Sequence, residues 1–225
     1  MKWLAVIVAL FAGVWAWIAP MPSRDAHRFR LTIEADTPDG PRAGSGVVEV
    51  ERKEGRWPVP GPRHVFRVRG EAVFVDLGGG RNLVAVLAHG ENAEDVDQVI
   101  TLWIEAYGHH RWDEEVWSGR RELRGVVELR PPLVPLLVTL ADPLDPNTVR
   151  VVRPGEFEAV FGPGFRFRRA TLEVVPASVP VTDGVIGQRL PWLVGVTTNL
   201  AGTRGRSTND IRERLTSLNF KRQDP

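Results

Sequence analysis

The sequence contains no cysteine among its 225 residues. This absence excludes a disulfide scaffold, a thiolate zinc site, a cysteine nucleophile and lipid attachment to an N-terminal cysteine. An excess of one charge is also lacking, because 29 Lys and Arg residues oppose 28 Asp and Glu residues. Without a basic surplus the chain has no overall attraction to nucleic acid, and we expect no nucleic-acid partner. The remaining composition, 43% hydrophobic and 25% charged, is that of a globular protein.

One long apolar run is present, and it lies at the N-terminus. Residues 3–19, WLAVIVALFAGVWAWIA, carry no charged side chain. As a helix rising about 1.5 Å per residue, the run would cover roughly 25 Å, slightly less than a hydrocarbon core. Trp3 lies at one end and Trp15 and Trp17 at the other, which suits indole rings placed in the two headgroup layers. The run predicts an uncleaved transmembrane helix within residues 1–22.

Two other interpretations of this run compete with the anchor. A cleaved signal peptide would end in a small-x-small site, which Ala16-Trp17-Ile18 matches poorly. A buried core helix would carry polar residues on one face, and none interrupts the run.

The flanking charges leave the orientation open. Lys2 precedes the run, and three arginines follow it closely: Arg24, Arg28 and Arg30. By the positive-inside rule this excess would place the body in the cytoplasm. A short Met-Lys lead before an apolar run is nevertheless typical of exported chains, and large domains translocate despite moderate charge. We therefore expect the body on the exported side, and the absence of cysteine is compatible with an oxidising compartment.

The length of the chain and the distribution of its prolines and glycines divide it into an anchor (1–22), a globular body (27–176) and a tail (177–225). A body of about 150 residues fits one domain with a sizeable core. The 18 prolines and 22 glycines interrupt the chain at spacings that suit short strands better than long helices.

Strict alternation of apolar and polar side chains gives the clearest strand prediction. In residues 28–35, RFRLTIEA, every second side chain is apolar, as in a strand with one buried face. The turn sequence DTPDGP follows at 36–41, where Asp39-Gly40 can adopt positive φ. Residues 46–50 then return as the second strand of a hairpin.

A second strand block is predicted at 64–78, with a bend or bulge at Gly70. Residues 72–75 are apolar on both faces and predict a central strand covered on both sides. Residues 82–88 are its expected partner. In 165–175 the apolar positions change from odd to even numbers, and one extra residue near Arg168-Arg169 would explain the change, so we predict a β-bulge there.

Helical patterns are weaker. Residues 99–107 fit a strand or a helix, whereas 109–123 and 207–218 favour helices. The chain as a whole predicts a mainly β fold, an antiparallel sandwich or curved sheet with one or two short helices, plus the N-terminal transmembrane helix. The alternative is an α+β fold in which residues 95–123 are largely helical.

Four stretches resemble an uncharacterised family of bacterial hypothetical proteins that have an N-terminal apolar segment and a β-rich body. They are RFRLTIEADTPDG, RVRGEAVFVDLG, FGPGFRFRRATLEV and PVTDGVIGQRLPWL. The resemblance covers residues 27–193 in patches and is weakest across 91–130. It implies a bacterial membrane-anchored setting and brings no reaction, cofactor or site residue with it. Combined with an exported body, it predicts a single-pass protein of the bacterial inner membrane with a periplasmic domain.

The stretch richest in potential metal ligands is HHRWDEE at 109–115. On a helix, His109 and Asp113 would share a face at i,i+4 spacing, and such a pair can bind a divalent metal. His110 and Glu114 would form a second pair. The stretch lacks a motif such as H-E-x-x-H, and a solvated polar face is the competing explanation.

The tail carries a surplus of basic residues, with six basic and three acidic side chains in 200–225. Asp210 and Glu213 resemble a capping box at the start of the predicted helix. Such a helix could lie on an anionic membrane or dock on a partner; it could equally pack on its own domain or fray. The candidate membrane or partner contacts are Trp3, Trp15, Trp17, Arg204, Arg206, Arg212, Arg214, Lys221 and Arg222.

Three further features have competing functional and structural explanations. Ser45 lies between two glycines but lacks the G-x-S-x-G pattern of a nucleophile, which favours a turn entering a strand. The glycines in 76–82 could cradle an anion, although a tight hairpin explains them more simply. Arginines on outer strand faces could bind acidic headgroups, or could pair across strands with Glu34, Glu49 or Glu173.

We therefore expect a membrane-anchored, non-enzymatic binding or interaction domain without a cofactor. Its expected partners are the membrane, through the anchor, and a membrane protein. One alternative is a metal-dependent hydrolase that uses the His109/His110 region. The other is a protein that binds anionic lipid surfaces through its basic tail.

Overall fold

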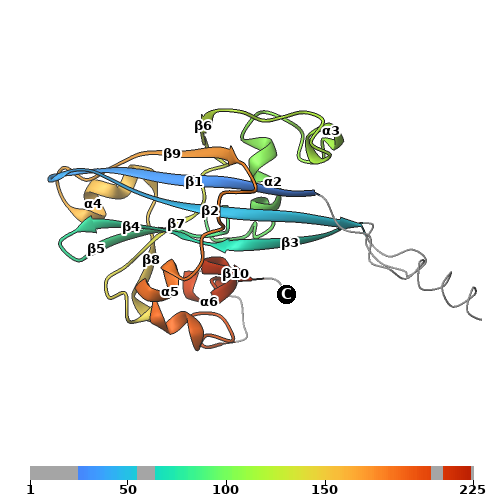
Figure 1. The fold of residues 1–225 in the computed structure, drawn as a ribbon. Coiled ribbons are helices and arrows are strands. Elements are labelled where there is room, and N and C mark those ends of the chain that lie inside the picture. The colour runs from blue at the N-terminus through green and yellow to red at the C-terminus, as the bar shows by residue number, and fades with distance from the viewer. Residues whose placement is uncertain (1–24, 55–63, 204–209, 224–225) are drawn as a thin grey trace, which may run out of the picture.

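The computed structural model of the protein describes residues 25–54, 64–203 and 210–223. The fold is mainly β, as predicted, with two antiparallel sheets and a few short helices (Figure 1). Within these residues, no helix is both long and apolar enough to cross a bilayer. The transmembrane helix predicted in residues 1–22 lies outside the described residues.

The two sheets pack face to face around a shared apolar core. The larger sheet contains, in spatial order, β10 (Lys221–Gln223), β3 (His64–Glu71), β2 (Gly40–Glu54), β1 (Asp25–Thr37), β9 (Arg166–Val175) and β6 (Val126–Glu128). The smaller sheet contains β4 (Val73–Gly78), β5 (Arg81–Ala85), β7 (Leu137–Leu140) and β8 (Val149–Val151).

The predicted hairpin is confirmed as β1 and β2. Phe29, Leu31 and Ile33 point inward and are buried, whereas the side chains between them lie on the outer face. Thr37 pairs with Gly40 across a two-residue turn, and Gly40 has a φ of +108°. That backbone conformation is accessible to glycine at little cost.

The predicted β-bulge is confirmed in β9. Opposite β1, Glu34 pairs with Arg169. The next residue of β1, Ala35, pairs with Phe167, so Arg168 is the extra residue. The bulge allows both halves of β9 to place apolar side chains on the inner face.

The prediction of a central strand at 72–75 is wrong, because β4 lies at an edge of the smaller sheet. Its two faces are nevertheless covered. Val73 and Val75 face β2 of the larger sheet. On the other face the guanidinium of Arg189 lies 5.3 Å from the ring centroid of Phe74. Packing from outside the sheet therefore explains the apolar pattern.

Gly44 and Gly46 allow β4 to cross β2 at short range. A Cβ atom at Gly44 would lie 2.3 Å from the carbonyl oxygen of Phe74, which no packed structure tolerates. At Gly46 the corresponding distance to Cγ2 of Val73 is 3.4 Å. The turn expected at Ser45 is therefore wrong, because Ser45 lies in the middle of β2 and its neighbouring glycines serve the contact between the sheets.

Residues 109–123 are helical only in α3 (Glu114–Trp117), and the remainder forms turns and irregular structure. The carboxylate of Asp113 caps this single turn of helix, and Gly119, at a φ of +71°, follows it. The prediction of a longer helix is wrong, and so is the alternative α+β fold with 95–123 largely helical.

The other helices are also short. α2 (Gln98–Glu105) adopts the helix that was one of two structures expected for 99–107. The rest are η1 (Pro146–Thr148), η2 (Pro154–Glu156), α4 (Phe157–Phe161), α5 (Val185–Arg189), η3 (Pro191–Val194), α6 (Ile211–Arg214) and α7 (Ser217–Phe220). The predicted tail helix is divided in its described part, because Leu215 is extended between α6 and α7.

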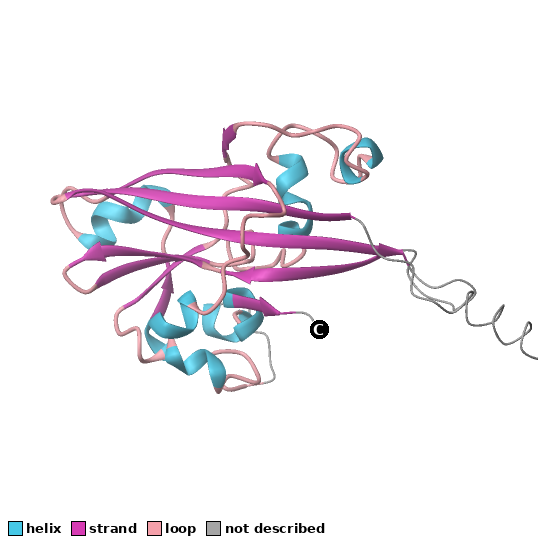
Figure 2. Ribbon diagram, in the orientation of Figure 1, coloured by secondary structure: helices cyan, strands magenta, loops and turns pink. Residues whose placement is uncertain are grey.

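The tail forms a third layer on the face of the smaller sheet that points away from the larger one (Figure 2). Leu190, Leu215 and Phe220 are fully buried there in a second core, which includes Val84 and Val138 of the sheet. β10 also extends the larger sheet by pairing with β3. The described residues of the tail thus pack on their own domain, which is one of the alternatives that the sequence leaves open.

The contact between the sheets can be tested with Gly44→Ala. We expect it to lower the free energy of unfolding by about 1–3 kcal/mol, because the new methyl group must push β4 away from β2. The matched control is the adjacent, exposed Ser45→Ala, expected to change stability by less than about 0.5 kcal/mol. Urea unfolding of the full chain in mild detergent, followed by circular dichroism, gives both values, and equal midpoints would contradict the packing role.

Candidate functional site

The structure brings together two of the four predicted metal ligands, His109 and Asp113. Nδ1 of His109 lies 3.6 Å from Oδ2 of Asp113. The guanidinium of Arg121 lies against both, 3.3 Å from the His109 nitrogen and 3.2 Å from the Asp113 oxygen. A positive charge therefore already occupies the position beside these two groups.

The other two candidates, His110 and Glu114, are turned elsewhere. Nδ1 of His110 accepts a hydrogen bond from the backbone N–H of Trp112. The carboxylate of Glu114 binds the guanidinium of Arg52 at 2.8 and 2.9 Å, which lowers the pKa of Glu114. Throughout the described parts of the chain, no group of three or more His, Asp or Glu side chains is arranged to hold a metal ion. Metal binding at 109–114 stays a prediction.

The described basic residues of the tail contact the protein itself. Arg212 pairs with Asp210 at 2.6 Å. Lys221 lies 2.6 Å from Asp183. Nη2 of Arg222 donates to the carbonyl oxygen of Val96. Arg214 is half-buried, whereas Trp3, Trp15, Trp17, Arg204 and Arg206 lie outside the described residues. Contact of this set with a membrane or partner stays a prediction.

The outer face of the larger sheet carries ion pairs between neighbouring strands. Arg169 binds Glu34 at 2.8 Å, while Arg28 and Arg69 both bind Glu49. Burial alone would raise the pKa of Glu49, but the hydrogen bonds from Arg69 and Arg28 outweigh burial and lower it. These contacts confirm the cross-strand pairing that was weighed against headgroup binding.

The glycines of 76–82 form the hairpin turn that was weighed against an anion cradle. Gly78 pairs with Arg81 between β4 and β5, and Gly78, Gly79 and Gly80 all have positive φ. The carboxylate of Asp76 accepts a hydrogen bond from the backbone N–H of Gly78. The backbone N–H of Gly78 is therefore already hydrogen-bonded by a side chain of the turn itself.

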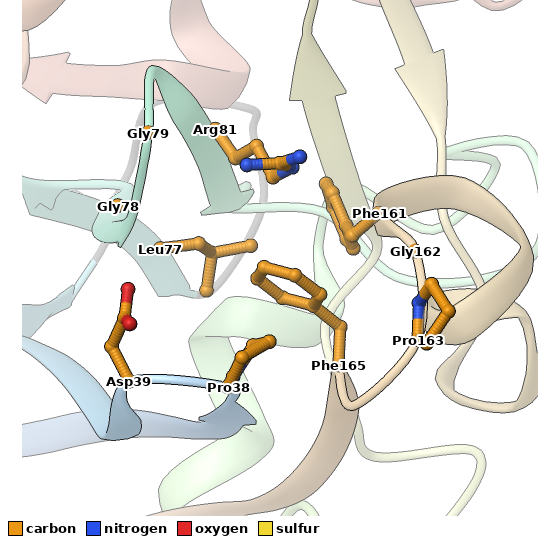
Figure 3. A pocket seen from close by; sticks show the side chains of 10 residues that line it. All are labelled: Pro38, Asp39, Leu77, Gly78, Gly79, Arg81, Phe161, Gly162, Pro163 and Phe165. Carbon is orange, nitrogen blue, oxygen red and sulfur yellow. The ribbon is translucent and has the colours of Figure 1, made fainter.

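An open cleft of about 270 Å³ lies where this hairpin turn meets two others (Figure 3). The second is the turn between β1 and β2, and the third is the loop between α4 and β9. The residues lining the cleft are Pro38, Asp39, Leu77, Gly78, Gly79, Arg81, Phe161, Gly162, Pro163 and Phe165.

The floor of the cleft is apolar, and its rim carries one charge of each sign. Leu77, Phe161 and Phe165 are buried. The guanidinium of Arg81 lies 5.2 Å from the ring centroid of Phe165. Among the described residues, neither Arg81 nor Asp39 has an ion-pair partner. The cleft thus offers an apolar surface beside an unpaired cation.

The sequence did not predict this cleft, although it predicted two of the three turns, at 36–41 and at 76–82. Glycine marks each turn, but the β4–β5 turn meets the other two only because the two sheets stack. The other two turns also lie close together, since a Cβ atom at Gly164 would lie 3.2 Å from Cγ of Pro38. Three glycine-rich turns at the ends of neighbouring strands were the available signal.

Comparison of the chain with models of protein families, with curated proteins and with solved structures gives no match. The resemblance of four stretches to a bacterial family therefore stays a prediction.

A buried histidine, His89, lies beyond β5 and is 3% exposed. Its backbone pairs with Asp95, but neither ring nitrogen makes a hydrogen bond of good geometry in the described part of the chain. Burial lowers the pKa of His89 to about 4, and the nearby carboxylate of Asp95 and a weak contact with the backbone of Leu133 oppose this shift only in part.

His89 makes stability depend on pH. Unfolded histidine binds a proton near pH 6.5, whereas folded His89 does so only near pH 4. The free energy of unfolding therefore contains the full contribution of neutral His89 above pH 6.5. This contribution declines by on the order of 3 kcal/mol as the pH falls to 4.

We expect His89→Leu to flatten the decline in unfolding free energy between pH 6.5 and pH 4. His110→Leu, at an exposed histidine, is the matched control and should retain the parent slope. Urea titrations at several pH values measure both slopes. A slope in His89→Leu as steep as that of the parent protein would show that other groups carry the dependence.

Proposed function

We propose that the protein is a membrane-anchored, non-enzymatic binding domain whose cleft receives a segment of a partner protein. The uncharged run at 3–19 supports the anchor. The cleft supports the binding role, because it lies at the turn end of the β1–β2 hairpin and the anchor precedes the other end of β1. The 13 residues of β1 span roughly 40 Å, which separates the cleft from the bilayer.

The chemistry of the cleft indicates what the partner presents. An apolar side chain of the partner would bury its own surface on this apolar floor, at about 25 cal/mol per Å² of apolar area. A carboxylate beside that side chain would form a charge-assisted bond with Arg81. We infer that the partner is a protein of the same bacterial inner membrane, with an apolar and acidic segment on the periplasmic side.

The lining of the cleft supports binding rather than catalysis. Its titratable side chains are Asp39 and Arg81. A guanidinium transfers no proton at neutral pH, so the described lining offers a single carboxylate for acid–base chemistry. The unpaired Arg81 over an aromatic floor is the observation that carries the proposal.

The proposal is tested by photo-crosslinking in membranes. A photoreactive residue replaces Pro163 at the rim of the cleft, and a matched probe replaces Leu144, an exposed residue that does not line it. We expect one reproducible adduct with another membrane protein from position 163 and none from position 144.

Arg81→Gln should reduce that adduct by about tenfold, because it removes a charge-assisted bond of roughly 1.4 kcal/mol. Arg150→Gln, at an exposed arginine of β8 outside the cleft, should leave the yield unchanged. Equal adducts from positions 163 and 144, or a yield that ignores Arg81→Gln, would refute the cleft as the binding site.

A further inference from the structure

An exposed aromatic surface lies at the end of the molecule where β1 begins. We call it the tryptophan ledge and define it as Trp112 and Phe66. Trp112 is 50% exposed. The rings of Trp112 and Phe66 lie 5.5 Å apart, so the two form one apolar surface.

The ledge rests on a rigid aromatic base. Trp112 stacks on Trp117 at 6.5 Å, and Trp117 meets Trp103 edge-on at 5.2 Å. His27 of β1 stacks on Trp103 at 4.2 Å, and its Nε2 lies 2.9 Å from the carbonyl oxygen of Trp117. Since Trp117 and Trp103 are fully buried, Trp112 is held outward by the core.

Trp112 differs from the other described tryptophans in its hydrogen bonding. The indole N–H groups of Trp103, Trp117 and Trp192 each donate to a backbone carbonyl oxygen. The indole N–H of Trp112 has no acceptor among the described residues. An exposed ring with a free donor at one edge is the form in which tryptophan is enriched at membrane interfaces.

The ledge lies close to the first described residue of β1. Arg52 links this end of β1 to α3, which follows Trp112 in the chain, because its guanidinium binds Asp25 of β1 and Glu114 of α3, each at 2.8 Å. Figure 1 shows α3 at the end of the molecule where β1 begins. Residues 20–24 are all that separates the apolar run from β1. Five residues span at most about 17 Å when fully extended, so an anchored chain holds this end of the body at the headgroups.

The arginines around the ledge are paired with carboxylates. Arg111 pairs with Glu105, and Arg121 pairs with both Asp113 and Glu115. A surface of this composition contacts lipid through its aromatic and apolar atoms, without a net positive charge. Its contact should therefore be insensitive to salt and to anionic lipid.

We propose that the tryptophan ledge contacts the bilayer in which the anchor lies, with Trp112 at the boundary between headgroups and acyl chains. This inference rests on the proposed membrane anchoring. It adds a second attachment point, which fixes the body so that the cleft faces away from the membrane.

The absence of cysteine makes the test direct, because single cysteines can be introduced without removing others. Three variants of the full chain carry a fluorophore: Arg111→Cys beside the ledge, Ala43→Cys near the far end of β2, and Ala12→Cys in the apolar run. Each is reconstituted in phosphatidylcholine nanodiscs containing lipids with a nitroxide near the headgroup and, in a second preparation, near the middle of the acyl chain. We expect the label at 111 to lose most of its fluorescence to the headgroup nitroxide and the label at 12 to lose most of its fluorescence to the acyl-chain nitroxide. The label at 43 should keep its fluorescence in both preparations, in low and high salt alike.

The outcomes separate the two proposals. Quenching at position 12 with full brightness at 111 would preserve the anchor and overturn the ledge. No quenching at position 12 would overturn the anchor and the ledge with it. Trp112→Ser in the Arg111→Cys background should restore most of the fluorescence at 111. Unchanged quenching there would overturn the role of Trp112, because the short tether alone would then explain the proximity.

Discussion

The buried carboxylate of Glu71 holds the layers of the molecule together. It lies at the end of β3, where the chain leaves the larger sheet to enter β4 of the smaller one. Its oxygens accept hydrogen bonds of 2.8–3.0 Å from the backbone N–H groups of Gly184, Val185 and Ile186. Nζ of Lys221 lies 3.2 Å away and supplies the opposite charge. A charged carboxylate is tolerated in this interior because both of its oxygens accept backbone hydrogen bonds and the ammonium group of Lys221 balances its charge.

The sequence predicted the strands wherever one face is buried and the other solvated. Alternation is then recorded residue by residue, and even the extra residue at Arg168 appears as a change of parity. Prediction from the sequence failed where a strand is covered by elements other than its neighbours in the same sheet. Residues 72–75 are apolar because another sheet and the tail cover them, which no local pattern encodes. In 109–123 the spacing of apolar residues suits a helix, but the cap at Asp113 and Gly119 restrict it to one turn.

The candidate cleft depends on the same distinction. Two of the three turns around it were predicted, yet the contact between Pro38 and Gly164 requires the register of β1 with β9, and Arg81 gains its position over Phe165 only when both sheets are stacked. The proposed metal ligands illustrate the opposite error. Their pairing assumed helical spacing from 109 onward, whereas the helix begins at Glu114.

The order of strands in the larger sheet has a kinetic consequence. β1 lies between β2, which follows it in sequence, and β9, which is far away: Arg30 bonds Glu173 across 143 positions. Contacts of such high contact order form slowly, since closing the intervening loop costs entropy before pairing compensates it. Until β9 arrives, one edge of β1 is available to other chains. The alternate charged side chains of β1 would discourage such pairing, so the outer ion-pair face also protects the nascent protein from aggregation.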